Sequence, residues 1–122
     1  CDIEELVKDS RGFTNHKIVK KQIGDDYDKL WDYSPLKHAQ KITIPVMLIH
    51  GSDDSRVWPK QSEMMFDKLK GVDKKVEYIE LDGGDHHLSN TEHRLITFKA
   101  MERFLQQQLP TKTSNNLTLS KN

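Results

Sequence analysis

The chain has 122 residues, of which 34% are hydrophobic and 31% are charged, and its 19 Lys and Arg balance its 19 Asp and Glu. This length accommodates a single globular domain. The net charge of zero gives no electrostatic reason to expect nucleic acid or an anionic membrane as a partner. The single Cys, at position 1, excludes an internal disulfide. No apolar run reaches the ~18 residues of a membrane-spanning helix.

The amino-terminal end of the sequence shows no signal peptide. The chain begins with Cys and not Met, in what resembles the first turn of a helix. We therefore expect that upstream sequence is missing, and that any targeting segment is missing with it. The sequence leaves the compartment open, with the cytoplasm slightly favoured.

The first third of the chain predicts short helices joined by loops. Residues 2–9 form a helix that Asp2 can cap. Residues 10–24 have weak periodicity and are interpreted as a loop with a possible short helix. Residues 25–31 begin with acidic side chains, which suit the positive end of a helix dipole. Residues 34–36 have the Ser-Pro order of a cap followed by the first helical position.

Two strand–helix units follow. Residues 44–50 are apolar at almost every position, which predicts a parallel strand buried on both faces. A helix is expected over 59–70, ending at Gly71. Residues 75–81 alternate with Glu and predict an outer strand with one wetter face. Because strand–helix–strand crossovers are right-handed, the two strands should be parallel.

A long helix is expected over 90–108. Ser89 and Glu92 have the spacing of a capping box in front of it. Residues 1–109 are taken as the folded domain and 110–122 as a disordered polar tail. The predicted core-facing stripe of the long helix consists of Leu95, Phe98, Met101, Leu105 and Leu109.

Acidic and imidazole side chains follow the two strands. Asp53 and Asp54 come after the first strand, and His86 and His87 come after the second. Since parallel strands end at one edge of the sheet, a carboxylate and an imidazole can meet there. Such a carboxylate fixes the tautomer of the imidazole, which then takes a proton from a nucleophile. The order Asp then His ends the Ser…Asp…His order of α/β-hydrolases, but no Gly-x-Ser-x-Gly nucleophile motif occurs in the chain.

Three motifs carry a resemblance to a known family: Tyr33-Ser34-Pro35-Leu36, then His50-Gly51-x-x-Asp54-x-Arg56-Val57, then Gly83-Gly84-Asp85-His86-His87-Leu88-Ser89. Together they resemble the carboxyl-terminal end of the catalytic domain of prolyl oligopeptidase-type serine peptidases, a group that includes dipeptidyl and acylaminoacyl peptidases. The resemblance covers residues 2–109. It implies an α/β fold, namely the carboxyl-terminal portion of an α/β-hydrolase with parallel strands and flanking helices.

The resemblance also implies roles for single residues. Asp54 matches the Asp of the catalytic triad, and His86 is favoured over His87 as its His. Arg56 stands where many members hold a substrate carbonyl, although a plain surface ion pair remains an equal alternative. Trp58, beside the Asp loop, is a candidate for the substrate pocket. The resemblance implies that the parent protein cleaves peptides. Nothing in this chain matches the family's serine, so the fragment alone should be inactive.

Several alternatives stay open at this stage. The parent protein could be an esterase, or the chain could be a non-catalytic interaction module. A metal site is not expected, because adjacent His side chains diverge and no metal-binding motif is present, and no cofactor is implied. His50 is expected to be a hydrogen-bonded structural residue. A fragment of a sheet has an uncovered strand edge, which recruits partners, so we expect self-association.

Overall fold

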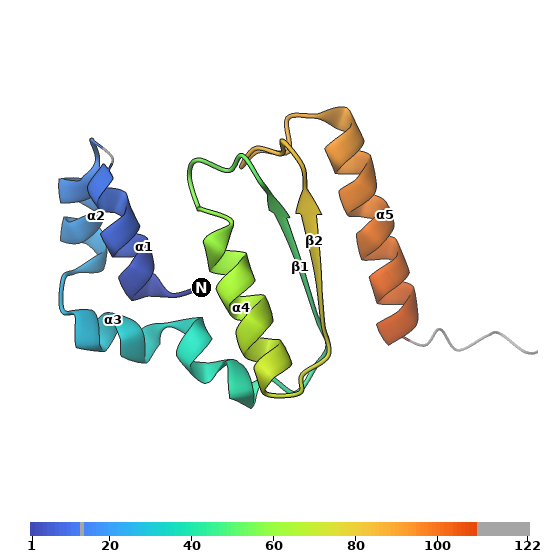
Figure 1. Cartoon of the computed structure of the whole chain (residues 1–122), viewed down its shortest axis with the longest axis horizontal. Helices are drawn as coiled ribbons and strands as arrows, with labels where there is room; N and C mark the ends of the chain where they lie inside the picture. Colours follow the sequence, from blue (N-terminus) through green and yellow to red (C-terminus); the bar gives the residue numbers. More distant parts are fainter. Residues whose placement is uncertain (13, 110–122) are drawn as a thin grey trace, which may run out of the picture.

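The computed structural model describes residues 1–12 and 14–109. Two parallel strands, β1 (Val46–Gly51) and β2 (Val76–Leu81), lie between helices α4 (Lys60–Gly71) and α5 (Thr91–Gln108) (Figure 1). The strands pair in register from Val46 with Val76 to Gly51 with Leu81. The predicted parallel strand–helix–strand–helix order is therefore confirmed, whereas the expectation for 110–122 lies outside the described residues. Within the described part, no helix is long and apolar enough to cross a membrane.

Short helices precede the sheet and lie beside α4, on its side away from the strands (Figure 1). Asp2 caps the first of them as expected, because its Oδ1 accepts the N–H of Glu5 at 3.1 Å. The segment 10–24, interpreted as a loop with a possible helix, contains a short 3₁₀ turn and a true helix. These elements are α1 (Ile3–Asp9), η1 (Ser10–Gly12), α2 (His16–Ile23), α3 (Tyr27–Tyr33) and η2 (Pro35–Lys41).

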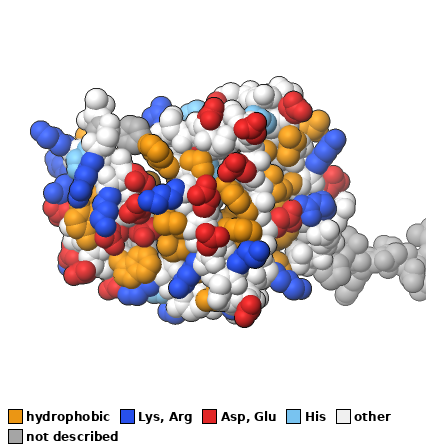
Figure 2. All heavy atoms as spheres, in the orientation of Figure 1, with side chains coloured by type: hydrophobic (Ala, Val, Ile, Leu, Met, Phe, Trp, Pro, Cys, Tyr) orange, Lys and Arg blue, Asp and Glu red, His pale blue; other side chains and the backbone are white. Residues whose placement is uncertain are grey.

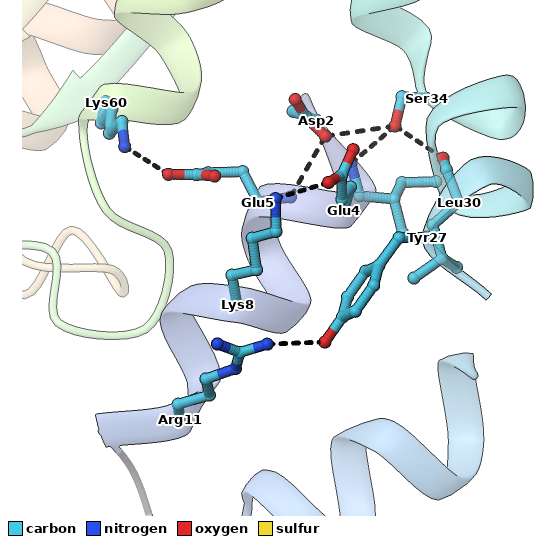
Figure 3. Close-up of polar contacts among 10 residues, drawn as sticks. Asp2, Glu4, Glu5, Lys8, Arg11, Tyr27, Leu30, Ser34 and Lys60 are labelled. Carbon is cyan, nitrogen blue, oxygen red and sulfur yellow. Dashed lines mark hydrogen bonds and ion pairs between the residues drawn. The ribbon is translucent and has the colours of Figure 1, made fainter. Parts of the chain in front are cut away.

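Polar side chains tie α1 to its neighbours (Figure 3). The fully buried Ser34, between α3 and η2, accepts the N–H of Ile3 at 2.8 Å and donates to the carbonyl of Leu30 at 2.7 Å. On the other side of α1, Lys60 at the start of α4 pairs with Glu5. The first helix is therefore fixed to both α3 and α4.

The hydrophobic core lies between α4, η2 and one face of the sheet. Met65 and Leu69, on the inner face of α4, are 7% and 0% exposed. Alternate side chains of β1, Val46 and Leu48, pack against this cluster, as expected for a strand with one face toward a helix. The buried members of the cluster are Leu36, Ala39, Met65 and Leu69.

The other face of the sheet is less covered than the sequence suggested. Every residue of β1 from Val46 to His50 is only partly buried, and Gly51 alone is buried. The expectation of a strand buried on both faces is wrong for this structure. In the described part of the chain, β1 has a strand neighbour along one edge only, and a cavity separates its second face from α5.

The predicted core stripe of α5 is also wrong, since these side chains are 42–63% exposed. Thr97 and Ala100 are the buried residues of the helix instead. In the described part of the chain the sheet beside α5 has only two strands, and a cavity lined by Met101 and Leu105 lies between them and the helix, so the stripe has little to pack against. Figure 2 shows hydrophobic side chains at the surface in the region of α5. The exposed stripe comprises Leu95, Phe98, Met101, Leu105 and Leu109.

The amino terminus of α5 differs by one residue from the capping-box prediction. Asn90, not Ser89, is the cap, and its side chain accepts the N–H of Glu92 at 2.8 Å. The N–H of Ser89 is used by the preceding loop, where Asp85 accepts it at 2.9 Å. A carboxyl group in that loop therefore takes the donor of Ser89, and the helix starts one position later.

The carboxyl terminus of α4 also ends later than predicted. Gly71 is the last helical residue, and the left-handed residue that reverses the chain is Asp73, with φ of 55°. The N–H of Lys74 donates to the carbonyl of Leu69 at 2.9 Å, and that of Asp73 donates to Lys70 at 3.1 Å. This is the bonding pattern of a Schellman motif, in which short polar residues can replace Gly.

The carboxyl ends of β1 and β2 approach each other through two glycines. A Cβ atom at Gly51 would overlap the backbone carbonyl group of Gly84, and one at Gly84 would lie 3.0 Å from the Cα of Gly51. Both residues are buried. The loops that follow the two strands can therefore lie against each other only while both positions lack a side chain.

We predict that Gly51→Ala lowers the free energy of unfolding by about 1–3 kcal/mol or more, because backbone must move to admit the methyl group. Chemical denaturation measures the change. Gly71→Ala is the matched control, since nothing lies within 4 Å of its new Cβ; it should alter stability by no more than about 1 kcal/mol. Equal effects of the two substitutions would contradict the steric role of Gly51.

Candidate active site

Two loops leave the carboxyl ends of β1 and β2 and are joined by hydrogen bonds. The N–H of Ser52 donates to the carbonyl of Leu81 at 3.0 Å, and the N–H of Asp53 donates to the carbonyl of Gly84 at 2.9 Å. In the opposite direction, the N–H of Gly83 donates to Oγ of Ser52 at 2.8 Å. These bonds continue the strand pairing beyond the sheet, so side chains from the two loops are held at a fixed separation.

Asp54 lies where the loops meet and is 8% exposed. Its Oδ1 accepts two backbone N–H groups, from Arg56 at 2.8 Å and from Val57 at 2.9 Å. Its Oδ2 lies 2.8 Å from Nδ1 of His86 and 3.2 Å from Nε2 of His50. Both carboxylate oxygens are therefore satisfied, and the tight turn of the Asp loop fixes their direction.

The charge state of Asp54 follows from these contacts. Burial disfavours the carboxylate, but hydrogen bonds from Val57, from His86 and from Arg56 outweigh it, so the pKa of Asp54 is lowered from its ordinary value. The group is a carboxylate at neutral pH, and it accepts the hydrogen that His86 carries on Nδ1.

The imidazole of His86 has the geometry of a directed base. Its side chain is 42% exposed, and with Nδ1 facing Asp54 it has no hydrogen-bond partner for Nε2 within residues 1–12 and 14–109. A hydrogen on Nδ1 leaves the lone pair on Nε2, where it can accept a proton. His87 lies edge-on to the His86 ring, at 5.3 Å between centroids. The structure therefore brings His86 to Asp54, and His87 beside it.

His50 lies next to Asp54 and connects the site to α4. Its Nε2 donates to the carbonyl of Val57 at 2.8 Å, and its Nδ1 lies 2.6 Å from the hydroxyl of Ser62 on α4. His50 is a hydrogen-bonded residue, as expected, but its approach to Asp54 was not predicted. The signal was present in the spacing, since His50 and Asp54 are separated by a turn that begins at a Gly.

The His loop is shaped by contacts of Asp85, Leu88 and Arg94 that the sequence did not predict. Oδ1 of Asp85 accepts the N–H groups of His87 and Ser89, at 3.1 and 2.9 Å. Leu88 adopts the left-handed conformation, with φ of 50°, which is costly for a bulky residue. Arg94 on α5 donates to the carbonyls of Leu88 and Ser89, at 2.8 and 2.9 Å. Arg94 thus holds the strained end of the loop.

Two cavities adjoin the site. The first, of about 620 Å³, lies between β1 and α5 and reaches Asp54 and His86. The second, of about 460 Å³, lies at the loop that follows Asp54, and both Arg56 and Trp58 line it. The four residues selected from the sequence thus divide into a hydrogen-bonded pair and two exposed side chains at a separate cavity. In the described ranges, no group of three or more His, Cys, Asp or Glu is placed to hold a metal ion.

We predict that Asp54 contributes stability that is lost in acid. Because the pKa of Asp54 is lowered in the folded state, its contribution is complete above the unfolded pKa of ~4 and disappears as the pH falls through the folded pKa. Asp54→Asn should therefore destabilise the protein at pH 7. The difference in stability between the variant and the unsubstituted protein should become smaller below pH ~4. Unfolding midpoints over a pH series measure this.

The exposed neighbour Asp53 supplies the control for that experiment. Asp53→Asn should follow the unsubstituted protein at every pH. A gap for Asp54→Asn that stays constant down to pH ~2.5 would contradict the assigned charge state.

Comparison with known proteins places the chain in a family. Residues 2–112 match the model of the prolyl oligopeptidase family. A relative from Bacillus subtilis (strain 168), described as the uncharacterized peptidase YuxL, is 38% identical over 69 residues. That match covers 57% of this chain and 10% of the relative, so the chain spans a small part of the protein it resembles.

Solved structures show the same relation. A Mycobacterium tuberculosis puromycin-hydrolyzing peptidase superposes with a TM-score of 0.79 at 24% identity, over 89% of this chain and 17% of its own. The Pyrococcus horikoshii acylaminoacyl peptidase superposes with a TM-score of 0.73 at 26% identity, over 91% of this chain and 20% of its own. The expected architecture, part of an α/β-hydrolase fold with parallel strands and flanking helices, is confirmed, and the chain belongs to the prolyl oligopeptidase family.

Proposed function

We propose that residues 1–109 are the carboxyl-terminal part of the catalytic domain of a serine peptidase, and that 110–122 are a polar tail. In this proposal Asp54 and His86 are two members of a Ser-Asp-His triad. The observation that carries it is the 2.8 Å contact between Nδ1 of His86 and Oδ2 of Asp54, which leaves Nε2 of His86 available. The chain spans only 10–20% of the relatives compared above, so the serine is assigned to another segment of a longer protein.

The proposed reaction proceeds through an acyl-enzyme. Nε2 of His86 removes the proton of the serine hydroxyl as its oxygen attacks the peptide carbonyl, and the Asp54 carboxylate stabilises the imidazolium that forms. His86 then gives this proton to the departing amine. In the second half, His86 takes a proton from water, the hydroxide attacks the acyl group, and the proton returns to the serine. Without a serine at His86, the isolated chain is proposed to be inactive.

Arg56 and Trp58 are proposed to contact the peptide. Arg56 donates its backbone N–H to Asp54, so its exposed side chain starts at the catalytic loop itself. Its guanidinium can donate to a substrate carbonyl. Trp58 is 53% exposed and offers an aromatic face next to it. No cofactor or metal has a role in this chemistry.

We predict that Asp54→Asn and His86→Gln each lower kcat of the full-length protein by about 10³–10⁴-fold on acyl-peptide substrates, because the His tautomer or the base is lost. Initial rates with chromogenic peptides measure this, and circular dichroism checks the fold. His87→Gln is the matched control and should keep kcat within a few-fold. Loss of activity in His87→Gln with activity retained in His86→Gln would contradict the proposal and identify His87 as the base.

The same assay separates the proposed function from its alternatives. Peptide and ester substrates of equal acyl group are compared in the full-length protein. Hydrolysis of esters without peptides would make the protein an esterase on the same fold. If the position that faces His86 in the full-length protein is not a nucleophile, and neither substrate class is cleaved, the chain is a non-catalytic interaction module.

The isolated chain is also proposed to associate with itself. In the described part, β1 has one edge without a strand partner, and Phe98 and Met101 on α5 are 63% and 42% exposed. We predict dimers or larger species by size-exclusion chromatography with light scattering, and a shift toward monomer in Phe98→Lys. A monomer at every concentration would refute the proposal.

A further inference from the structure

The second cavity is formed in part by the short helices, which the proposed reaction does not use. It lies between the short helices α1 and α2 and the loop after Asp54, and Val57 lines both this cavity and the first one. Its volume of about 460 Å³ is within the range of small-molecule sites. Its apolar wall consists of Leu6, Val19, Ile23, Val57 and Trp58. A ligand with a hydrocarbon portion could therefore bury it here, against Val57, whose backbone N–H donates to Asp54.

Two charges of opposite sign line this apolar cavity. Asp9, at the carboxyl end of α1, and Arg56, on the catalytic loop, both line it. Within the described residues, neither side chain has a hydrogen bond or an ion pair. The nearest cation on α4, Lys60, is already paired with Glu5. Asp9 is thus a carboxylate without a counterion of its own.

The surroundings of Asp9 agree with this description. Burial, and then the nearby carboxylate of Glu5, raise the pKa of Asp9, and Lys60 offsets them only in part. A cation bound beside Asp9 would remove this penalty, because an opposite charge favours the carboxylate.

The wall that carries Asp9 is held in place without a ligand. Ile3 at the start of α1 donates to Ser34, Glu5 pairs with Lys60, and Arg11 just beyond the helix donates to the hydroxyl of Tyr27 at 2.9 Å (Figure 3). These contacts fix α1 against α3 and α4. A preformed wall lowers the ordering cost of binding, so a ligand in this cavity would meet an ordered surface.

We propose that the second cavity is a specificity subsite for a cationic group carried on an apolar stem. The stem packs against the apolar wall, the cation binds the carboxylate of Asp9, and Arg56 holds a carbonyl oxygen of the same peptide. A lysine or arginine side chain has this chemistry, and so does a free amino terminus. This inference rests on the proposed peptidase function and adds to it the class of substrate.

The test uses the full-length protein and matched peptide substrates. Pairs that differ only by Lys or norleucine are made at each of the first three positions on the acyl side, each with a free or an acetylated amino terminus. We expect a preference for Lys at one position, or for the free terminus, and we expect Asp9→Asn to reduce that kcat/KM ratio by about 10- to 100-fold. The first pattern assigns a basic side chain, and the second assigns an amino terminus.

Glu4→Gln is the matched control, because Glu4 is an acid on the same helix that pairs with Lys8 and does not line the cavity. It should keep the substrate ratio of the unsubstituted protein. Hydrolysis of both members of every pair with equal kcat/KM would overturn the subsite and leave the peptidase proposal standing. An equal change of the ratio in Glu4→Gln and Asp9→Asn would also overturn it, since a general field effect would explain both.

A binding measurement keeps the inference testable if no peptide is cleaved. Acetyl-alanyl-lysine amide, its norleucine analogue and the free-terminus form alanyl-norleucine amide are titrated while tryptophan fluorescence is recorded, because Trp58 lines the cavity. A cationic form should bind about 10-fold or more tightly than the neutral one, and Asp9→Asn should abolish the difference. Such binding without hydrolysis would refute the peptidase proposal alone, whereas equal binding of all three would refute the subsite.

Discussion

The contact between two glycines at the ends of β1 and β2 is the constraint on which the site depends. With no side chain at Gly51 or Gly84, the two loops pack backbone to backbone and exchange hydrogen bonds beyond the sheet. This places the Asp54 carboxylate and the His86 imidazole within 2.8 Å although they are 32 positions apart. The geometry of the strands therefore brings Asp54 and His86 together, and the contacts of their side chains set only the final orientation.

The hydrogen bonds of Asp54 fix the direction of its carboxylate. Two backbone N–H groups hold one oxygen and two imidazoles approach the other. Because backbone donors cannot rotate away, the second oxygen stays directed at His86. His50 joins the arrangement to α4 through Ser62, so the hydrophobic core and the polar site share one network of fixed groups.

The sequence predicted what depends on local pattern and on the handedness of crossovers. The parallel strands, the order of helices and the meeting of the Asp and His loops are of this kind, since the apolar run before Asp54 and the glycines before His86 indicate them directly. It did not predict which apolar side chains of α5 would be covered. The stripe that includes Phe98 has the periodicity of a core helix, but periodicity reports only that a face is apolar and not what lies against it. Likewise Asp73 and Asn90 take the capping positions expected of Gly71 and Ser89, because neighbouring polar residues compete for the same backbone groups.

The two cavities beside Val57 are bounded by different kinds of bonding. The loops of Asp54 and His86 are joined to each other largely by main-chain hydrogen bonds, whereas α1 is fixed largely by side chains such as Ser34 and Lys60. Replacing residues of the short helices would consequently reshape one cavity while the carboxylate–imidazole pair keeps its geometry. Under the two proposals above, drift in one small helical segment would change which substrates bind, while the proposed reaction would stay the same.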